Sequence, residues 1–183
     1  MKNIFKSLMI VVLFVGLGSS AFAQTVTANT SMAASATILS DLAIEKNVDL
    51  TFGQVINSTI PTMEANSANK TAVGETATLG KFTVTGLAGA SVQVEFNVPT
   101  LDNGESSIVF TPSVYRTEKS TLAYGETEIT TGSSYNINSS VVADQSVAGT
   151  DYFYVGGNIV VGTAAEDPAG TYTGTFTMTV AYN

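Results

Sequence analysis

The sequence contains no cysteine and no histidine. Without cysteine the fold cannot depend on disulfide bonds, so it must be held together by its core. The two absences also exclude a Ser-His-Asp triad, a thiol nucleophile and a zinc site built from these side chains. We therefore expect no catalytic residue, no metal site and no cofactor, and we expect that the protein is not an enzyme.

Basic residues are also scarce, with seven lysines and arginines against fifteen aspartates and glutamates. A chain with this charge repels a phosphate backbone, so we expect no nucleic-acid partner. Long apolar runs are missing as well. The longest, residues 8–17, is about half of the roughly 20 residues that span a bilayer. We expect no stable membrane anchor.

The first 23 residues have the pattern of a secretory signal peptide. Lys2 and Lys6 precede the apolar run, and Ala21-Phe22-Ala23 follows it as a small-x-small cleavage site. Cleavage after Ala23 leaves 160 residues that begin at Gln24 and carry a net charge of −10. We expect an exported protein in the periplasm, at the cell surface or outside the cell, with no lipid because there is no cysteine to acylate.

The mature chain is rich in Thr, Val, Ser and Gly and favours strands over helices. Apolar residues alternate with period two in residues 48–52, 92–98 and 108–114, which predicts half-buried strands. In residues 152–161 both the odd and the even positions carry apolar side chains, as in a central strand that is covered on both faces. There Gly156-Gly157 indicates a bulge or a close backbone approach.

Turn signals separate these segments, among them Asp102-Asn103-Gly104, which we interpret as a hairpin turn rather than a calcium loop. The polar residues 57–78 predict a long exposed loop, with at most a short strand. The fold class we expect for residues 39–183 is all-β, an immunoglobulin-like, pilin-like antiparallel β-sandwich of roughly seven to nine strands.

The C-terminal segment has the most regular alternation in the chain, and we predict that it forms the core strand of the domain. Between residues 171 and 179 every odd position is threonine. The residues that we assign to its inward face and to assembly are Gly170, Tyr172, Gly174, Phe176, Met178, Val180 and Tyr182. Because Gly174 has no side chain, we expect it to leave space for a residue of a neighbouring strand.

Five segments carry a resemblance to known proteins. They are residues 42–44, 49–53, 80–84 and 153–157 and the strand of residues 170–182. That strand, with a glycine fourteen residues from the end and a penultimate tyrosine, resembles the last strand of chaperone-usher pilin subunits. Nearly the whole mature chain is similar to an uncharacterised family of secreted pilin-like domains related to spore coat protein U.

The resemblance implies a pilin-like architecture. It also implies assembly with other pilin-like subunits or with itself, with a periplasmic chaperone and an usher as partners. Many chaperone-usher pilins have a disulfide, and none can form here because the chain has no cysteine.

Residues 24–38 also alternate, with Val26, Ala28, Met32 and Ile38 on the more apolar face. Two interpretations stay open for this N-terminal arm. It is either an ordinary first strand with a frayed end, or a donor strand that completes the fold of another subunit or of its own.

The sequence thus favours a structural or adhesive subunit. The alternative is a stand-alone secreted module that binds glycan or matrix, and there Tyr124 and Tyr135 are candidates for stacking on sugar. For these two rings we regard packing in or beside the core as the more ordinary use.

Overall fold

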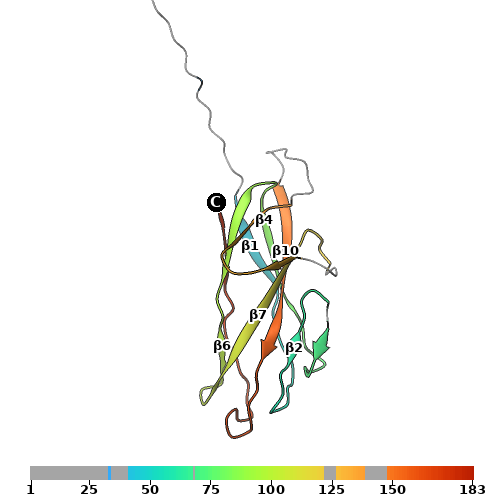
Figure 1. Cartoon of the computed structure of the whole chain (residues 1–183), viewed down its shortest axis with the longest axis vertical. Helices are drawn as coiled ribbons and strands as arrows, with labels where there is room; N and C mark the ends of the chain where they lie inside the picture. The colour runs from blue at the N-terminus through green and yellow to red at the C-terminus, as the bar shows by residue number, and fades with distance from the viewer. Residues whose placement is uncertain (1–32, 34–40, 68, 122–126, 139–147) are drawn as a thin grey trace, which may run out of the picture. The chain divides into compact units, whose positions relative to one another are not determined.

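The computed structural model describes residue 33 and residues 41–67, 69–121, 127–138 and 148–183 (Figure 1). The chain divides into two units, residues 1–37 and 38–183, and only Ala33 of the first is described. The predicted signal peptide and the arm residues Val26, Ala28, Met32 and Ile38 therefore lie outside the described residues. In the described part of residues 38–183 the regular elements are strands, and there is no helix.

Eleven strands form the domain: β1 (Ala43–Val48), β2 (Thr62–Met63), β3 (Lys70–Thr71), β4 (Gly80–Leu87), β5 (Ser91–Phe96), β6 (Thr100–Asp102), β7 (Ser107–Thr117), β8 (Thr127–Ile129), β9 (Ser133–Asn136), β10 (Ala148–Ile159) and β11 (Met178–Tyr182). This exceeds the expected seven to nine because β2, β3, β6 and β8 have only two or three residues each. Elements this short are too brief to show an alternating pattern.

Two antiparallel sheets share one core. The larger has eight strands, in which β10 pairs with β4 and then β2 along one side and with β7 along the other (Figure 1). The smaller has the order β11-β5-β9. Phe153 and Val84 of the larger sheet and Val94 and Met178 of the smaller one belong to the same buried cluster. The all-β fold with antiparallel sheets is therefore as predicted.

The central strand β10 confirms the prediction made from its two apolar faces. Phe153 and Val155 are buried on the core side, and Tyr154 is buried as well. The close backbone approach is also present, because a side chain at Gly156 would collide with the carbonyl oxygen of Met63. Gly157 has φ +124°, a conformation that L side chains rarely adopt.

Predictions for three loop segments had different outcomes. The turn after β6 is confirmed, since Gly104 has φ +88° and its N–H donates to Asp102 Oδ1 at 2.7 Å. Residues 57–78 are not simply an exposed loop: they contain β2 and β3, and Met63 of β2 is fully buried. The strand predicted at residues 48–52 is also wrong, because β1 ends at Val48 and only Thr51 forms a bridge, to Thr78.

A buried ion pair of the larger sheet is hydrogen-bonded to the smaller one. Asp151 of β10 is fully buried, and its Oδ1 lies 3.1 Å from Arg116 Nη2 on β7. The same nitrogen donates to the carbonyl oxygen of Asn136 in β9, the outer strand of the smaller sheet. Burial raises the pKa of Asp151, and the guanidinium of Arg116 partly offsets that rise. This pair connects the sheets in a domain that has no disulfide.

Candidate functional site

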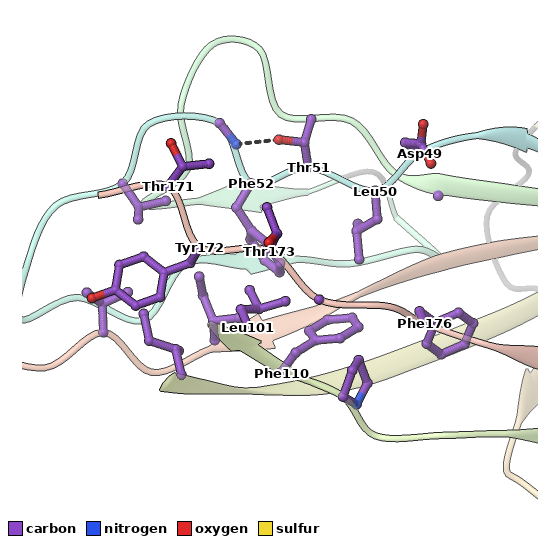
Figure 2. A pocket seen from close by; sticks show the side chains of 18 of the residues that line it. Asp49, Leu50, Thr51, Phe52, Leu101, Phe110, Thr171, Tyr172, Thr173 and Phe176 are labelled. Atoms are coloured by element: carbon purple, nitrogen blue, oxygen red, sulfur yellow. Dashed lines mark hydrogen bonds between the residues drawn. The ribbon is translucent and has the colours of Figure 1, made fainter. Parts of the chain in front are cut away.

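A groove of about 1220 Å³ with an apolar floor opens between two segments that are distant in sequence. Residues 46–57, from the end of β1 onward, form its first wall, and residues 167–176, before β11, form its second. Core side chains form its floor: Phe82, Leu101, Ile108, Phe110, Val155, Ile159 and Val161. Figure 2 shows Leu50 and Phe52 pointing from the first wall toward the second.

The first wall continues an edge strand that is poorly covered. β1 lies at the edge of the larger sheet, and all six of its residues are exposed. Ile44 is paired with the fully buried Val84, so both side chains lie on the core side of the sheet. Ile44 is nevertheless 40% exposed. The core side of β1 therefore lacks a covering element within the described residues.

The second wall presents a free backbone edge. The backbone groups of its odd-numbered residues point toward β6. Thr173 shows this, because it exchanges two backbone hydrogen bonds with Asp102, at 2.8 and 3.0 Å. Along an extended strand the intervening backbone groups point to the opposite side. In the described residues, the N–H and C=O groups of Tyr172, Gly174 and Phe176 have no backbone partner. This row of donors and acceptors faces away from β6, as at any unpaired sheet edge.

Aromatic rings extend from the core to the groove surface. Phe176 has ring centroids of Phe96, Phe82 and Phe110 at 5.7, 6.0 and 6.5 Å. Its own side chain is only half-buried. The groove is therefore an exposed part of the hydrophobic core rather than a separate cleft, and such an apolar surface is typical of a binding site for another chain.

Hydrogen bonds fix the end of the groove near Tyr172. The hydroxyl of this residue donates to the Pro168 carbonyl oxygen at 2.9 Å and lies 2.7 Å from Ser106 Oγ. Asp167 Oδ2 accepts the Gly162 N–H at 2.6 Å. This network holds the second wall in place although residues 167–172 belong to no strand.

Charge is nearly absent from the groove. Among the described residues of its lining, only Lys46, Asp49 and Asp167 are charged. Lys46 Nζ lies 2.6 Å from Asp49 Oδ1, and Asp167 is bonded to Gly162 as described. The groove thus suits an uncharged, extended and partly apolar segment.

Of the seven C-terminal residues predicted for assembly, Gly170, Tyr172, Gly174 and Phe176 line the groove. The other three, Met178, Val180 and Tyr182, form β11, which pairs only with β5 in the described residues. The predicted inward face is supported by burial, because Met178 is buried and the threonines at 171, 173, 175, 177 and 179 are exposed. The predicted strand of residues 171–182 is shorter than expected: only Met178–Tyr182 forms a strand, at the edge of its sheet, with Met178 in the core cluster.

The expected role of Gly174 is also wrong. A side chain at this position would collide with the carbonyl oxygen of Thr100 and approach Leu101 Cδ2 at 2.9 Å. The space is therefore already filled by β6 and not left for a neighbouring strand. Gly174 allows the second wall to lie close to β6.

Sequence reasoning missed the first wall as part of the site. Leu50 and Phe52 were expected within a strand, and only the alternation at residues 48–52 marked them. The stacking surface suggested for Tyr124 and Tyr135 has no support from the described residues. Tyr135 packs against Phe153 with ring centroids 5.6 Å apart, while Tyr124 lies outside the described residues.

Comparisons with known proteins identify the domain but no activity. No curated protein matches the chain. In the described residues no helix is long and apolar enough to cross a membrane. A family model described as a domain of unknown function, DUF4402, matches residues 42–182, a range that includes both walls of the groove. Because this match covers most of the sequence, the chain belongs to the DUF4402 family.

Proposed function

We propose that the protein is an exported, non-enzymatic structural or adhesive subunit with an immunoglobulin-like, pilin-like β-sandwich that lacks one strand. The observation that carries this proposal is the groove itself. It exposes the core between two segments, and the backbone groups of its second wall have no partner in the described residues. A strand placed there would cover the apolar floor and pair with that free edge.

The occupant that we propose is the N-terminal arm, residues 24–38, of a second copy. The arm has fifteen residues and the segment 170–182 has thirteen. Because extended chains rise by nearly the same distance per residue, about 3.3 Å, the two segments are similar in length when extended. No charged residue occurs between positions 24 and 40. This matches a groove whose three charged residues already have partners.

Filling the groove offers enough free energy to drive assembly. Burying a side chain such as Val26, Met32 or Ile38 contributes about 1.5 to 3 kcal/mol when burial is complete. Pairing the arm with Tyr172, Gly174 and Phe176 would add backbone hydrogen bonds, each with a net contribution of about 1 kcal/mol. A periplasmic chaperone and an usher are the partners that we propose for the subunit before its groove is filled.

The alternative proposal is a stand-alone binding module for glycan or matrix. It applies if the arm fills the groove of its own chain, because the product is then a closed monomer. The direction of the chain allows this, since the arm precedes β1, and β1 leads into the first wall. The two proposals predict different molecular masses for the folded mature protein: that of an assembly of copies for the first and that of a monomer for the second.

The experiment is to delete residues 24–34 from the mature protein and to add back a peptide of that sequence. We expect the truncated protein to lose stability and to aggregate, because the groove and its edge stay uncovered. The peptide should restore both solubility and melting temperature. A peptide of the same composition in scrambled order is the control and should not. If the truncated protein stays monomeric and equally stable without peptide, the arm is an ordinary terminus and the proposal is wrong.

A further inference from the structure

A second, smaller hollow lies on the other face of the larger sheet. It has a volume of about 290 Å³ and lies between the segment of β2 and the facing residues of β7 and β10. Its lining consists of Thr62, Met63, Glu64, Asn66, Ser113, Tyr115, Gly157 and Asn158. Tyr115 is paired with Tyr154, whose neighbours Phe153 and Val155 point into the core. Tyr115 therefore lies on the outer face of the sheet, away from the groove.

Several polar side chains meet in this hollow without a protein partner. Asn66, Ser113, Tyr115 and Asn158 are all half-buried. Within the described part of the chain, none of their side chains forms a hydrogen bond. Half-buried polar groups of this kind take their hydrogen bonds from water or from a ligand.

Glu64 at the same hollow differs from these four residues. Its carboxylate accepts hydrogen bonds from Ser67 Oγ and from Asn69 Nδ2, the second at 3.0 Å. These bonds lower the pKa of Glu64 and keep the carboxylate charged. The carboxylate is thus held at the hollow by its neighbours, where it can accept a further hydrogen bond and repels anions.

From these residues we infer a binding site for a neutral saccharide. The two amides, Asn66 and Asn158, both donate and accept hydrogen bonds, as the hydroxyls of a sugar require. The ring of Tyr115 offers an apolar face for the C–H groups of a pyranose and a hydroxyl for its edge. No lysine or arginine lines the hollow. An acidic sugar would therefore meet Glu64 without a compensating cation.

The surface beside the hollow also suits a ligand longer than one sugar ring. Asn158 is paired with Thr62, and the next outward pair along the same strands is Val160 with Ile60, by continuation of that register. Val160 is 60% exposed and Ile60 is 57% exposed. Apolar side chains at this position give the C–H face of a second ring a surface to contact. The site does not rest on the proposed assembly, because the groove lies on the core side of the same strands.

The experiment measures binding of the mature full chain to an immobilised panel of neutral oligosaccharides and their sialylated counterparts. We expect retention of neutral members, and expect Tyr115→Ala and Asn158→Ala each to weaken it about tenfold or more. Tyr115→Phe keeps the ring and should weaken binding less. Thr111→Ala is the matched control, because Thr111 is exposed, faces Asn158 in the register and does not line the hollow. It should change binding by less than about twofold.

Thermal unfolding of each variant verifies that it is folded. If an alanine variant is not folded, the binding of Tyr115→Phe provides the test instead. The inference is wrong if the folded wild-type chain retains no neutral saccharide at millimolar concentration. It is equally wrong if sialylated members bind better, or if Thr111→Ala weakens binding as much as Asn158→Ala. None of these results depends on whether the arm fills the groove.

Discussion

Phe153 and Phe176 belong to the same hydrophobic core, but their surroundings differ. Phe153 in β10 is fully buried and packs against Tyr135 of the smaller sheet. Phe176 has three aromatic neighbours, yet it is half-buried beside the groove. On the Phe153 side the sheets are joined by rings and by Arg116, which pairs with Asp151 and donates to the Asn136 carbonyl oxygen of the smaller sheet. On the Phe176 side the described residues provide no strand to close the sheets, which teaches that one core can be covered unequally at its two sides within the described part of the chain.

The largest expected effect compares these two rings by the same substitution. Phe153→Ala should cost about 3 to 5 kcal/mol, as for a fully buried phenylalanine. Phe176→Ala should cost less, about 1 to 3 kcal/mol, in a protein truncated by residues 24–34, because water already reaches the ring. Urea unfolding of both variants in the truncated and the mature protein checks this.

Comparing the truncated and the mature protein tests whether the arm covers Phe176. If it covers the groove, the cost of Phe176→Ala should rise in the mature protein, while that of Phe153→Ala should not change. Equal costs for the two rings in the truncated protein would contradict the claim that the groove side is open. A cost below about 1 kcal/mol for Phe176→Ala in the mature protein would contradict its assignment to the inward face.

Arg116→Met tests the side of the core that contains Phe153. The substitution leaves Asp151 buried without its cation, which should cost about 3 kcal/mol, near the low end of the usual range because the arginine side chain is 15% exposed. The double variant Arg116→Met with Asp151→Leu should recover most of that loss. A single variant as stable as the wild type by chemical denaturation would show that the pair does not hold the sheets together.

A smaller effect should appear with pH. Burial raises the pKa of Asp151, so the folded protein binds this proton more tightly than the unfolded chain does. The group therefore adds stability at low pH, and that contribution is lost as the pH rises above the ordinary aspartate pKa of about 3.9. The free energy of unfolding of the wild type minus that of Asp151→Asn should fall between about pH 4 and pH 7. A difference that rises over this range would contradict the sign of the shift.

The sequence pattern predicted the strands in which buried and exposed side chains alternate or both faces are buried. The alternation at residues 92–98 and 108–114 and the two apolar faces of residues 152–161 predicted β5, β7 and β10, because burial imposes a period of two on such strands. The inward face of the last segment was predicted for the same reason. The alternation does not show where backbone pairing stops, so a strand was expected over residues 171–182 and only Met178–Tyr182 forms one.

Other features depend on contacts between residues far apart in the chain. Arg116 and Asp151 are 35 positions apart and have no local signal that pairs them. Met63 lies in a polar stretch and is buried because its strand pairs with β10, where Met63 lies opposite Gly157 and joins the core cluster. The groove itself combines residues near position 50 with residues near position 170. One wall was predicted because its own alternation marks it, whereas the other is identified only by the fold.

The most direct test of the central claim uses the absence of cysteine from the chain, because only an introduced pair can then form a disulfide. Ser31→Cys would be combined in turn with Thr173→Cys, Thr175→Cys or Thr177→Cys, exposed threonines in the second wall or directly after it. A disulfide requires Cα atoms about 4 to 7 Å apart, so it reports close pairing of the arm with this edge.

We predict that at least one pair, on mild oxidation of the mature protein, yields a ladder of covalent oligomers on a denaturing gel. Ser31→Cys combined with Thr130→Cys, an exposed position outside the groove, is the control and should yield none. A monomer closed on itself would contradict assembly between copies. Cross-linking no greater than in the control pair would contradict the claim that the arm fills the groove.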